Sequence, residues 1–156
     1  MHKQKNKKNK YYLAGIFLCI VVVASIGITK VHSRDTNIVL KINGHNISVD
    51  VADTSQKQER GLGGRESICA QCGMIFLFDT LEQHKFWMKD MRFDIDIVWL
   101  DGDSVVHISK NVSHENQFLI ITVPQPTNRV LELPAGQSDI FGLKVGQQIR
   151  YPHKLY

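Results

Sequence analysis

The fold class of this chain is decided by the stretch Ile38-Val39-Leu40-Lys41-Ile42-Asn43-Gly44-His45-Asn46-Ile47-Ser48-Val49-Asp50-Val51. Branched apolar residues recur at every second position on both sides of Asn43-Gly44, as expected for strands with one buried face. Asn-Gly is the preferred two-residue hairpin turn, because both of its residues accept a positive φ. The stretch therefore predicts a β-hairpin.

Working outward from the hairpin, a short helix over 56–62 is expected, with Asp53, Thr54 or Ser55 as its N-cap and glycines at its end. One further helical turn fits between Gly136 and Gly142. Apolar, strand-like runs recur after the first helix, at 74–78, 85–89, 95–100, 105–108, 118–123, 130–133 and 148–151. So many short strands with one or two short helices predict a mainly β fold, an antiparallel sandwich or barrel.

The charge of the chain is divided unevenly. The 156 residues carry a formal net charge of +4, but residues 1–30 contain six Lys and no Asp or Glu. Residues 31–156 then hold 13 Lys and Arg against 15 Asp and Glu, a net charge of −2. A mildly acidic body disfavours nucleic-acid binding, which depends on basic surfaces.

The basic N-terminus leads into an apolar run over 11–28 that contains no charged residue. As a helix, these residues would rise about 27 Å, close to the roughly 30 Å of a bilayer's hydrocarbon core. Five lysines before the run predict a cytoplasmic N-terminus and an extracytoplasmic body. A cleaved signal peptide is the alternative, because its basic and apolar regions look similar. The expected division is 1–30 as anchor or signal, 31–37 as linker and 38–156 as the β domain.

Cys69 and Cys72 form a Cys-x-x-Cys pair between a glycine-rich loop and a strand. Three interpretations stay open: a local disulfide, a redox-active pair and half of a zinc site. The disulfide is favoured, because a redox pair needs a helix N-terminus and zinc needs two more ligands at matching spacing. No nucleotide-binding, metalloprotease or serine-hydrolase motif occurs, so no cofactor or metal is predicted.

The body resembles the domain of unknown function 192 family from about Val49 to Ile149. The resemblance rests on five ordered motifs: Val51-Ala52-Asp53-Thr54 followed by Glu59-Arg60-Gly61-Leu62; Gly73-Met74-Ile75-Phe76-Leu77-Phe78; Phe86-Trp87-Met88-Lys89; Asp96-Ile97-Val98-Trp99-Leu100-Asp101; and Val130-Leu131-Glu132-Leu133-Pro134-Ala135-Gly136 with Gly142-Leu143-Lys144-Val145-Gly146. It implies a jelly-roll-like fold and supplies no activity or catalytic residues. The chain departs from the family pattern at Asp90, Asp94 and the Cys69–Cys72 loop.

The stretch 84–89 is the most distinctive part of the body. If it is a strand, Lys85, Trp87 and Lys89 share one face. If this face is exposed, it offers an aromatic platform between two cations, which suits a glycan or an anionic ligand. Arg60 and Asp96, which belong to the family motifs above, are further candidates for ligand binding. A buried Trp87 packed in the core is the commoner outcome and is the favoured interpretation.

Asp94 and Asp96 lie two residues apart and therefore on one face of a strand. This spacing suits a pair of catalytic carboxylates, but it also suits an ion pair with Lys89 or Arg92, or bonds to backbone amides. The structural interpretation is favoured. The sequence thus predicts a membrane-anchored extracytoplasmic binding or accessory module of the envelope. The alternatives are an envelope hydrolase that uses the Asp pair and a structural partner in an envelope protein complex.

Overall fold

The computed structural model describes residues 37–151, and the hairpin lies at their start. Strands β1 (Asn37–Ile42) and β2 (His45–Ala52) pair antiparallel, with Ile42 opposite His45. Between them, Asn43 and Gly44 have φ values of 47° and 89°, as a two-residue turn of this type requires. The hairpin predicted from the alternation is confirmed.

The connection after β2 decides the topology of the sheet. It contains helix α2 (Ser55–Arg60), whose N-cap residue Thr54 accepts a hydrogen bond from the Lys57 amide. The helix is followed by a loop over residues 61–64 that contains three glycines and is called the glycine loop below. The chain then enters β3 (Cys72–Glu82), which runs parallel to β2. The wholly antiparallel sandwich predicted from the strand spacing is therefore wrong at this pair. Residues 53–71 are long enough for a crossover, which a parallel connection needs.

The remaining strands complete a six-stranded sheet of order β1-β2-β3-β8-β5-β6. They are β5 (Ile95–Asp101), β6 (Ser104–Val112) and β8 (Thr127–Pro134), all paired antiparallel. The short strands β4 (Phe86–Trp87) and β7 (Ile120–Ile121) form a separate two-stranded sheet. The mainly β prediction is confirmed, with a mixed sheet in place of an antiparallel one.

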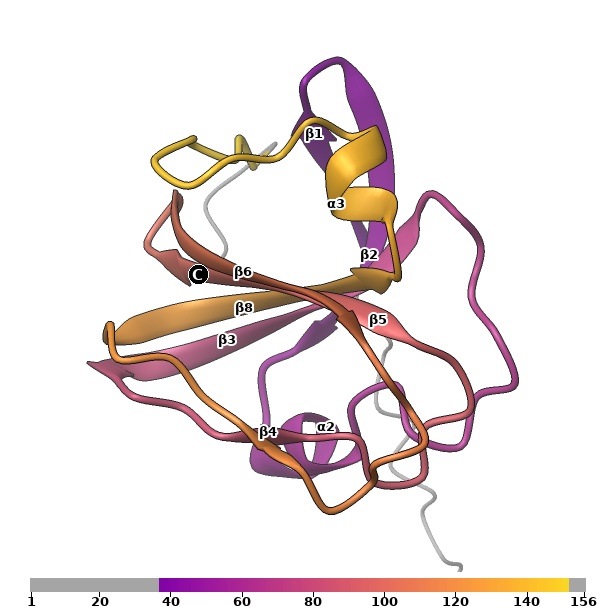
Figure 1. Cartoon of the computed structure of the whole chain (residues 1–156). Helices are drawn as coiled ribbons and strands as arrows, with labels where there is room; N and C mark the ends of the chain where they lie inside the picture. Colours follow the sequence, from indigo (N-terminus) through magenta and orange to yellow (C-terminus); the bar gives the residue numbers. More distant parts are fainter. Residues whose placement is uncertain (1–36, 152–156) are drawn as a thin grey trace, which may run out of the picture. The chain divides into compact units, whose positions relative to one another are not determined.

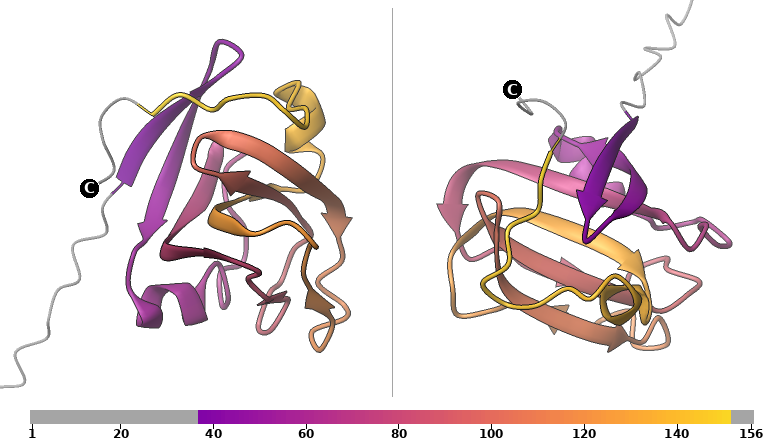
Figure 2. Two further views of the ribbon diagram at one scale, coloured as in Figure 1. Left: turned by 90° about the vertical axis from the view of Figure 1, so that its left-hand side faces the viewer. Right: turned by 90° about the horizontal axis from the view of Figure 1, so that it is seen from above.

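Both faces of the sheet are covered by apolar side chains. One core cluster joins β1 and β2 to Phe141, Leu143 and Ile149, which follow helix α3 (Gln137–Ile140). These elements lie above the central strands in Figure 1. The second cluster lies on the opposite face, where α2 and β4 are seen below the sheet. Isolated bridges from Gln148 to Ser104 and from Arg150 to Lys41 carry the C-terminal segment across between the edge strands β6 and β1 (Figure 2).

The predicted N-terminal anchor or signal over 11–28 and the linker lie outside the described residues, apart from Asn37. Within residues 37–151, no helix has both the length and the apolar character needed to cross a membrane.

Cys69 and Cys72 are joined by a disulfide that closes the loop before β3. We expect Cys69→Ser with Cys72→Ser to lower the free energy of unfolding by at most about 2 kcal/mol, because the closed loop is very short. Denaturant unfolding of the oxidised protein, the reduced protein and the double variant measures this effect. Equal stability of the reduced protein and the variant would be expected, and a large loss in either would contradict a purely local role.

Candidate functional site

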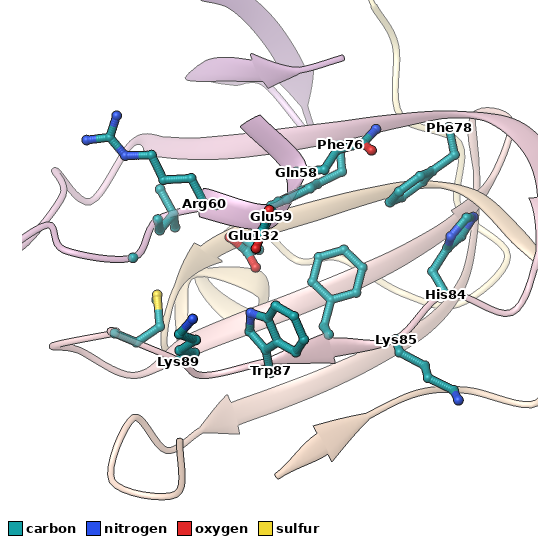
Figure 3. A pocket seen from close by; sticks show the side chains of 15 residues that line it. Gln58, Glu59, Arg60, Phe76, Phe78, His84, Lys85, Trp87, Lys89 and Glu132 are labelled. Atoms are coloured by element: carbon teal, nitrogen blue, oxygen red, sulfur yellow. The ribbon is translucent and has the colours of Figure 1, made fainter. Parts of the chain in front are cut away.

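A cavity of about 220 Å³ opens on the face of the sheet that carries the second core cluster. Strands β3 and β8 contribute residues to it, as do α2, the glycine loop and the segment 84–91 (Figure 3). Four aromatic side chains line it: Phe76, Phe78, Phe86 and Trp87. Its charged lining consists of Glu59, Arg60, Lys85, Lys89 and Glu132, together with the imidazole of His84.

The carboxyl group of Glu132 lies in this cavity on a central strand. The strand register places Glu132 between Met74 of β3 and Ile97 of β5, and the residue is only 5% exposed. Its oxygen Oε2 is buried and has no hydrogen-bond partner among residues 37–151. Gly61 is a close neighbour of this oxygen, and a Cβ atom added there would lie 3.9 Å from it.

Burial controls the ionisation of Glu132. The loss of solvation raises its pKa to about 8, and the charge of Arg65, which lowers the pKa, has a smaller effect. The Arg65 guanidinium is itself paired with the Asp50 carboxylate at 2.8 Å. At neutral pH the Glu132 carboxyl is therefore mainly protonated, so that it is able both to donate and to accept a hydrogen bond.

Phe86 holds the aromatic lining in place. Its ring makes edge-to-face contacts with Phe76 at 4.9 Å, with Trp99 at 5.3 Å and with Phe78 at 6.4 Å between centroids. These contacts connect the cavity wall to the fully buried Trp99, whose indole donates a hydrogen bond to Ser109. The arrangement is the one that aromatic quadrupoles favour, and it makes the wall rigid.

His84 closes one end of the cavity. Its imidazole stacks on Phe78 with 3.6 Å between centroids, and its Nε2 atom is buried without a hydrogen-bond partner in the described part of the chain. Its backbone carbonyl accepts a hydrogen bond from the Thr122 hydroxyl. Two lining residues of the cavity, Glu132 and His84, thus each have a buried side-chain atom without a hydrogen-bond partner among residues 37–151.

The segment 85–89 alternates in the way the sequence predicts. Met88 is fully buried, whereas Lys85, Trp87 and Lys89 are exposed, and Trp87 retains 46% of its accessible surface. The favoured interpretation of a buried Trp87 is therefore wrong, because β4 pairs only with the short β7 and no other sheet covers its outer face. In Figure 3, Lys89 lies beside Trp87 at the cavity, while the amine of Lys85 points away from it.

The glycine loop positions this segment. The amide of Gly64 donates a hydrogen bond to the carbonyl of Asp90 at 2.8 Å. A Cβ atom at Gly63 would come within 2.9 Å of the Arg60 carbonyl and 3.2 Å of the Lys89 carbonyl, so only glycine allows this approach. Asp90 has a φ of 59°, a conformation that Asp and Asn tolerate better than most residues.

Arg60 ends α2 and lines the cavity, with its guanidinium directed outward in Figure 3. Together with Lys89 it also lines an adjoining surface groove of about 700 Å³. The structure therefore brings four of the five predicted ligand-binding residues to one site: Arg60, Lys85, Trp87 and Lys89.

The fifth predicted residue, Asp96, lies elsewhere. Alternation along β5 puts Ile97 and Trp99 on the cavity side, so Asp96 faces the opposite side of the sheet, with Val98. Its fully buried carboxylate accepts hydrogen bonds from the backbone amides of Asn111, at 2.8 Å, and Ser138, at 3.0 Å. The expected ion pair with Lys89 or Arg92 is not formed, because Asp96 is bound by backbone amides and Arg92 pairs with Glu66.

Asp94 also has a local partner. Its carboxylate accepts a hydrogen bond from the His114 amide at 2.9 Å and lies 2.6 Å from His114 Nδ1. The hydrogen bond with the His114 side chain is the main cause that lowers the pKa of Asp94. Neither Asp94 nor Asp96 lines the cavity, and both bind the backbone of neighbouring elements. This geometry does not favour the predicted pair of catalytic carboxylates.

Glu132 is not among the site residues predicted from the sequence, although its sequence context carries a signal. Glu132 interrupts the apolar run Val130-Leu131-Leu133, and a carboxyl within such a run indicates a buried charge or a functional group. Within the part of the chain that the structure describes, no group of three or more His, Cys, Asp or Glu residues is placed to hold a metal ion.

Comparisons with known proteins give a family and a fold. The model of the DUF192 family, described as "Uncharacterized ACR", matches residues 38–151. A structure from Sinorhizobium meliloti, provisionally described as a transcription regulator, is similar with a TM-score of 0.67 and 25% identity, over 74% of this chain and 92% of the other. A protein of unknown function from Novosphingobium aromaticivorans is similar with a TM-score of 0.67 and 26% identity, over 74% and 84%. No curated protein matches the chain.

Proposed function

Because the chain belongs to the DUF192 family, an uncharacterised family without an assigned reaction, we propose a function from the cavity itself: this protein is a binding module for a small ring-bearing ligand, such as a sugar. The observation that carries this proposal is the half-exposed Trp87 at a cavity that is also lined by Glu132, whose Oε2 atom has no hydrogen-bond partner among residues 37–151. An exposed indole is a stacking surface, and buried polar groups give orientation and specificity.

The cavity is small and suits one ring better than a long chain. At about 220 Å³ it lies below the usual size of pockets for drug-sized molecules. The adjoining groove of about 700 Å³ shares Arg60 and Lys89 with the cavity, so a substituent on the ring is able to continue into it. Lys89, beside Trp87, offers a positive charge to such a substituent.

Trp87→Ala is expected to weaken ligand binding about tenfold or more, because stacking and the burial of the indole surface contribute on the order of 1.4 kcal/mol or more. A thermal-shift screen of the full-length protein in detergent against monosaccharides and small organic anions identifies a ligand, and titration calorimetry then measures its Kd. Because the second tryptophan, Trp99, is buried, quenching of exposed tryptophan fluorescence on binding reports on Trp87.

Phe118→Ala is the matched control for this experiment. Phe118 is 94% exposed and does not line the cavity, so its removal is expected to leave Kd unchanged. Equal affinity of the Trp87→Ala variant and the wild-type protein for every ligand found would refute the proposed function. A similar loss in both variants would point instead to a non-specific effect of surface aromatic residues.

We also propose that the domain lies outside the cytoplasm, held at the membrane by residues 11–28. The support comes from the uncharged apolar run and from the five lysines that precede it. Fractionation of cells that express the full-length chain tests this: carbonate-resistant membrane association supports an anchor, and a shortened soluble product supports a cleaved signal. Recovery of the full-length chain in the cytosol would contradict both.

The regulator description of the relative from Sinorhizobium meliloti is not extended to this chain. Residues 31–156 carry a net charge of −2, whereas nucleic-acid affinity comes mainly from neutralised phosphates. The proposed partners are therefore a small ligand and a bilayer, without nucleic acid.

A further inference from the structure

The carboxyl of Glu132 is the group in the cavity whose surroundings most restrict a ligand. It lies on the central strand β8, beside the buried residues Met74 and Ile97, and it lines the cavity next to Gly61. No residue between 37 and 151 accepts or donates a hydrogen bond at this oxygen. A buried carboxyl group without a partner is unfavourable, so a ligand that supplies the partner gains binding energy there.

We infer that the cavity takes a ring-bearing organic anion, that protonated Glu132 donates its hydrogen bond to an oxygen of this anion, and that the anion is released when Glu132 loses its proton. This inference rests on the proposed binding function and names its ligand class. Binding changes no covalent bond, because the Glu132 O–H group only donates a hydrogen bond to the anion oxygen. On ionisation the O–H bond breaks and its proton passes to solvent water.

The charges around Glu132 favour an anion over an organic cation. Lys89, from the segment at β4, lies beside Trp87 at the cavity, whereas the guanidinium of Arg60 in α2 and the amine of Lys85 point away from its interior. Opposing them is the exposed carboxylate of Glu59 on α2, while the residues that β3 contributes to the cavity, Phe76 and Phe78, carry no charge. The lining is therefore positive when Glu132 is neutral.

The other titratable groups near Glu132, Arg65 and His84, also agree with an anionic ligand. Arg65 acts on the carboxyl from beyond the glycine loop and is held by Asp50. His84 adds a buried ring nitrogen without a partner among the described residues. An ammonium ligand would have to ionise Glu132 and would meet the like charge of Lys89, whereas an anion meets that opposite charge and a neutral donor.

The test uses two anionic probes and their neutral counterparts: benzoate with benzyl alcohol, and glucuronate with glucose. Both anions stay fully ionised above about pH 6, so the ligand's charge is constant. Calorimetric titration of the full-length protein in detergent gives Kd at pH 7 and pH 9.5. If only the protonated pocket binds, and Glu132 has a pKa of about 8, the Kd of the bound anion rises about 30-fold over this range.

Glu132→Gln is the decisive variant, because its amide is similar in size and donates a hydrogen bond at every pH. In this variant the roughly 30-fold change of Kd between pH 7 and pH 9.5 is expected to disappear. All other ionisable groups of the lining are retained, so any pH dependence that they cause persists in the variant. The same pH profile in both proteins would overturn the inference.

A measurement on the wild-type protein alone gives an independent check. Titration at pH 8 in buffers of different ionisation enthalpy is expected to show the uptake of about half a proton for each anion bound. Proton release, or tighter binding at pH 9.5 than at pH 7, would overturn the inference.

The outcomes separate this inference from the function on which it rests. If a neutral probe binds more tightly than its anionic counterpart, the proposed binding function is retained and the inference of an anionic ligand is refuted. No binding by any probe, together with no Trp87-dependent ligand in the wider screen, would refute the binding function itself.

Discussion

Glu132→Gln is expected to remove a large pH dependence from the stability of this protein. Between pH 5 and pH 9 the wild-type protein should lose about 4 kcal/mol of unfolding free energy relative to the variant. The cause is the rise of the Glu132 pKa from 4.5 to about 8 on burial. Because the folded state holds this proton more tightly than the unfolded chain, the relative stability is greatest below pH 4.5 and is lost as the pH rises through the folded pKa near 8.

Urea unfolding of the full-length protein in detergent at pH 5, 7 and 9 measures this effect. Glu59→Gln is the matched control, since it makes the same chemical change in the same cavity at an exposed position. Its stability curve is expected to run parallel to the wild-type curve. If the Glu132→Gln curve also runs parallel, the carboxyl of Glu132 is solvated and ionised in the folded protein, contrary to its burial.

A buried carboxyl without a hydrogen-bond partner lowers the free energy of unfolding. Glu132→Leu is therefore an informative companion to Glu132→Gln, because an apolar side chain suits a position beside Met74 and Ile97. Proteins that keep such groups commonly do so for function. The proposed binding function would give this protein a physical reason to retain a carboxyl on β8.

Asp96→Ala is expected to lower the free energy of unfolding by about 3 kcal/mol without changing the affinity for a ligand in the cavity. The Asp96 carboxylate binds the backbone amides of Asn111 in β6 and of Ser138 in α3, and its loss leaves both amides without their partner. Because Asp96 faces away from the cavity, the lining residues keep their positions. Urea unfolding gives the stability, and calorimetric titration with the ligand gives the affinity.

Asp94→Ala is the control for this effect. Its side chain is 43% exposed and binds only His114, so its removal is expected to lower the free energy of unfolding by less than about 1 kcal/mol. A stable Asp96→Ala protein would show that the two amides find other partners. Loss of ligand affinity at unchanged stability would instead revive a direct role for the carboxylate pair.

The local features of the fold were predictable because neighbouring residues determine them. The turn at Asn43-Gly44 needs two positive φ values, and the helix over Ser55–Arg60 needs a cap and a glycine stop. The parallel pairing of β2 with β3 was not predictable in this way. It depends on where residues 53–71 lead the chain, and strand spacing alone does not contain that information.

The candidate site likewise has features that the local sequence predicts and features that depend on tertiary packing. The alternation of Lys85, Trp87 and Lys89 follows from the two-residue period of a strand, and the sequence predicted it. Whether that face is covered depends on which elements pack on it, and the pairing of β4 with the short β7 alone leaves Trp87 exposed. Asp96 does not line the cavity, although it was a ligand-binding candidate. Sequence motifs do not tell which side of the sheet faces the cavity.

By itself, the sequence determined a mainly β domain of the DUF192 family, its hairpin, its short helices and the alternation of its aromatic and basic residues. These properties depend on local backbone preferences and on the periodicity of apolar side chains. Only the tertiary structure decided that Glu132 meets Trp87 in one cavity while Asp96 lies behind the sheet. Trp87 and Glu132, 45 positions apart in the sequence, come together in a fold in which β8 pairs with β3 and β5. The burial of Glu132 on β8 raises the pKa of its carboxyl group.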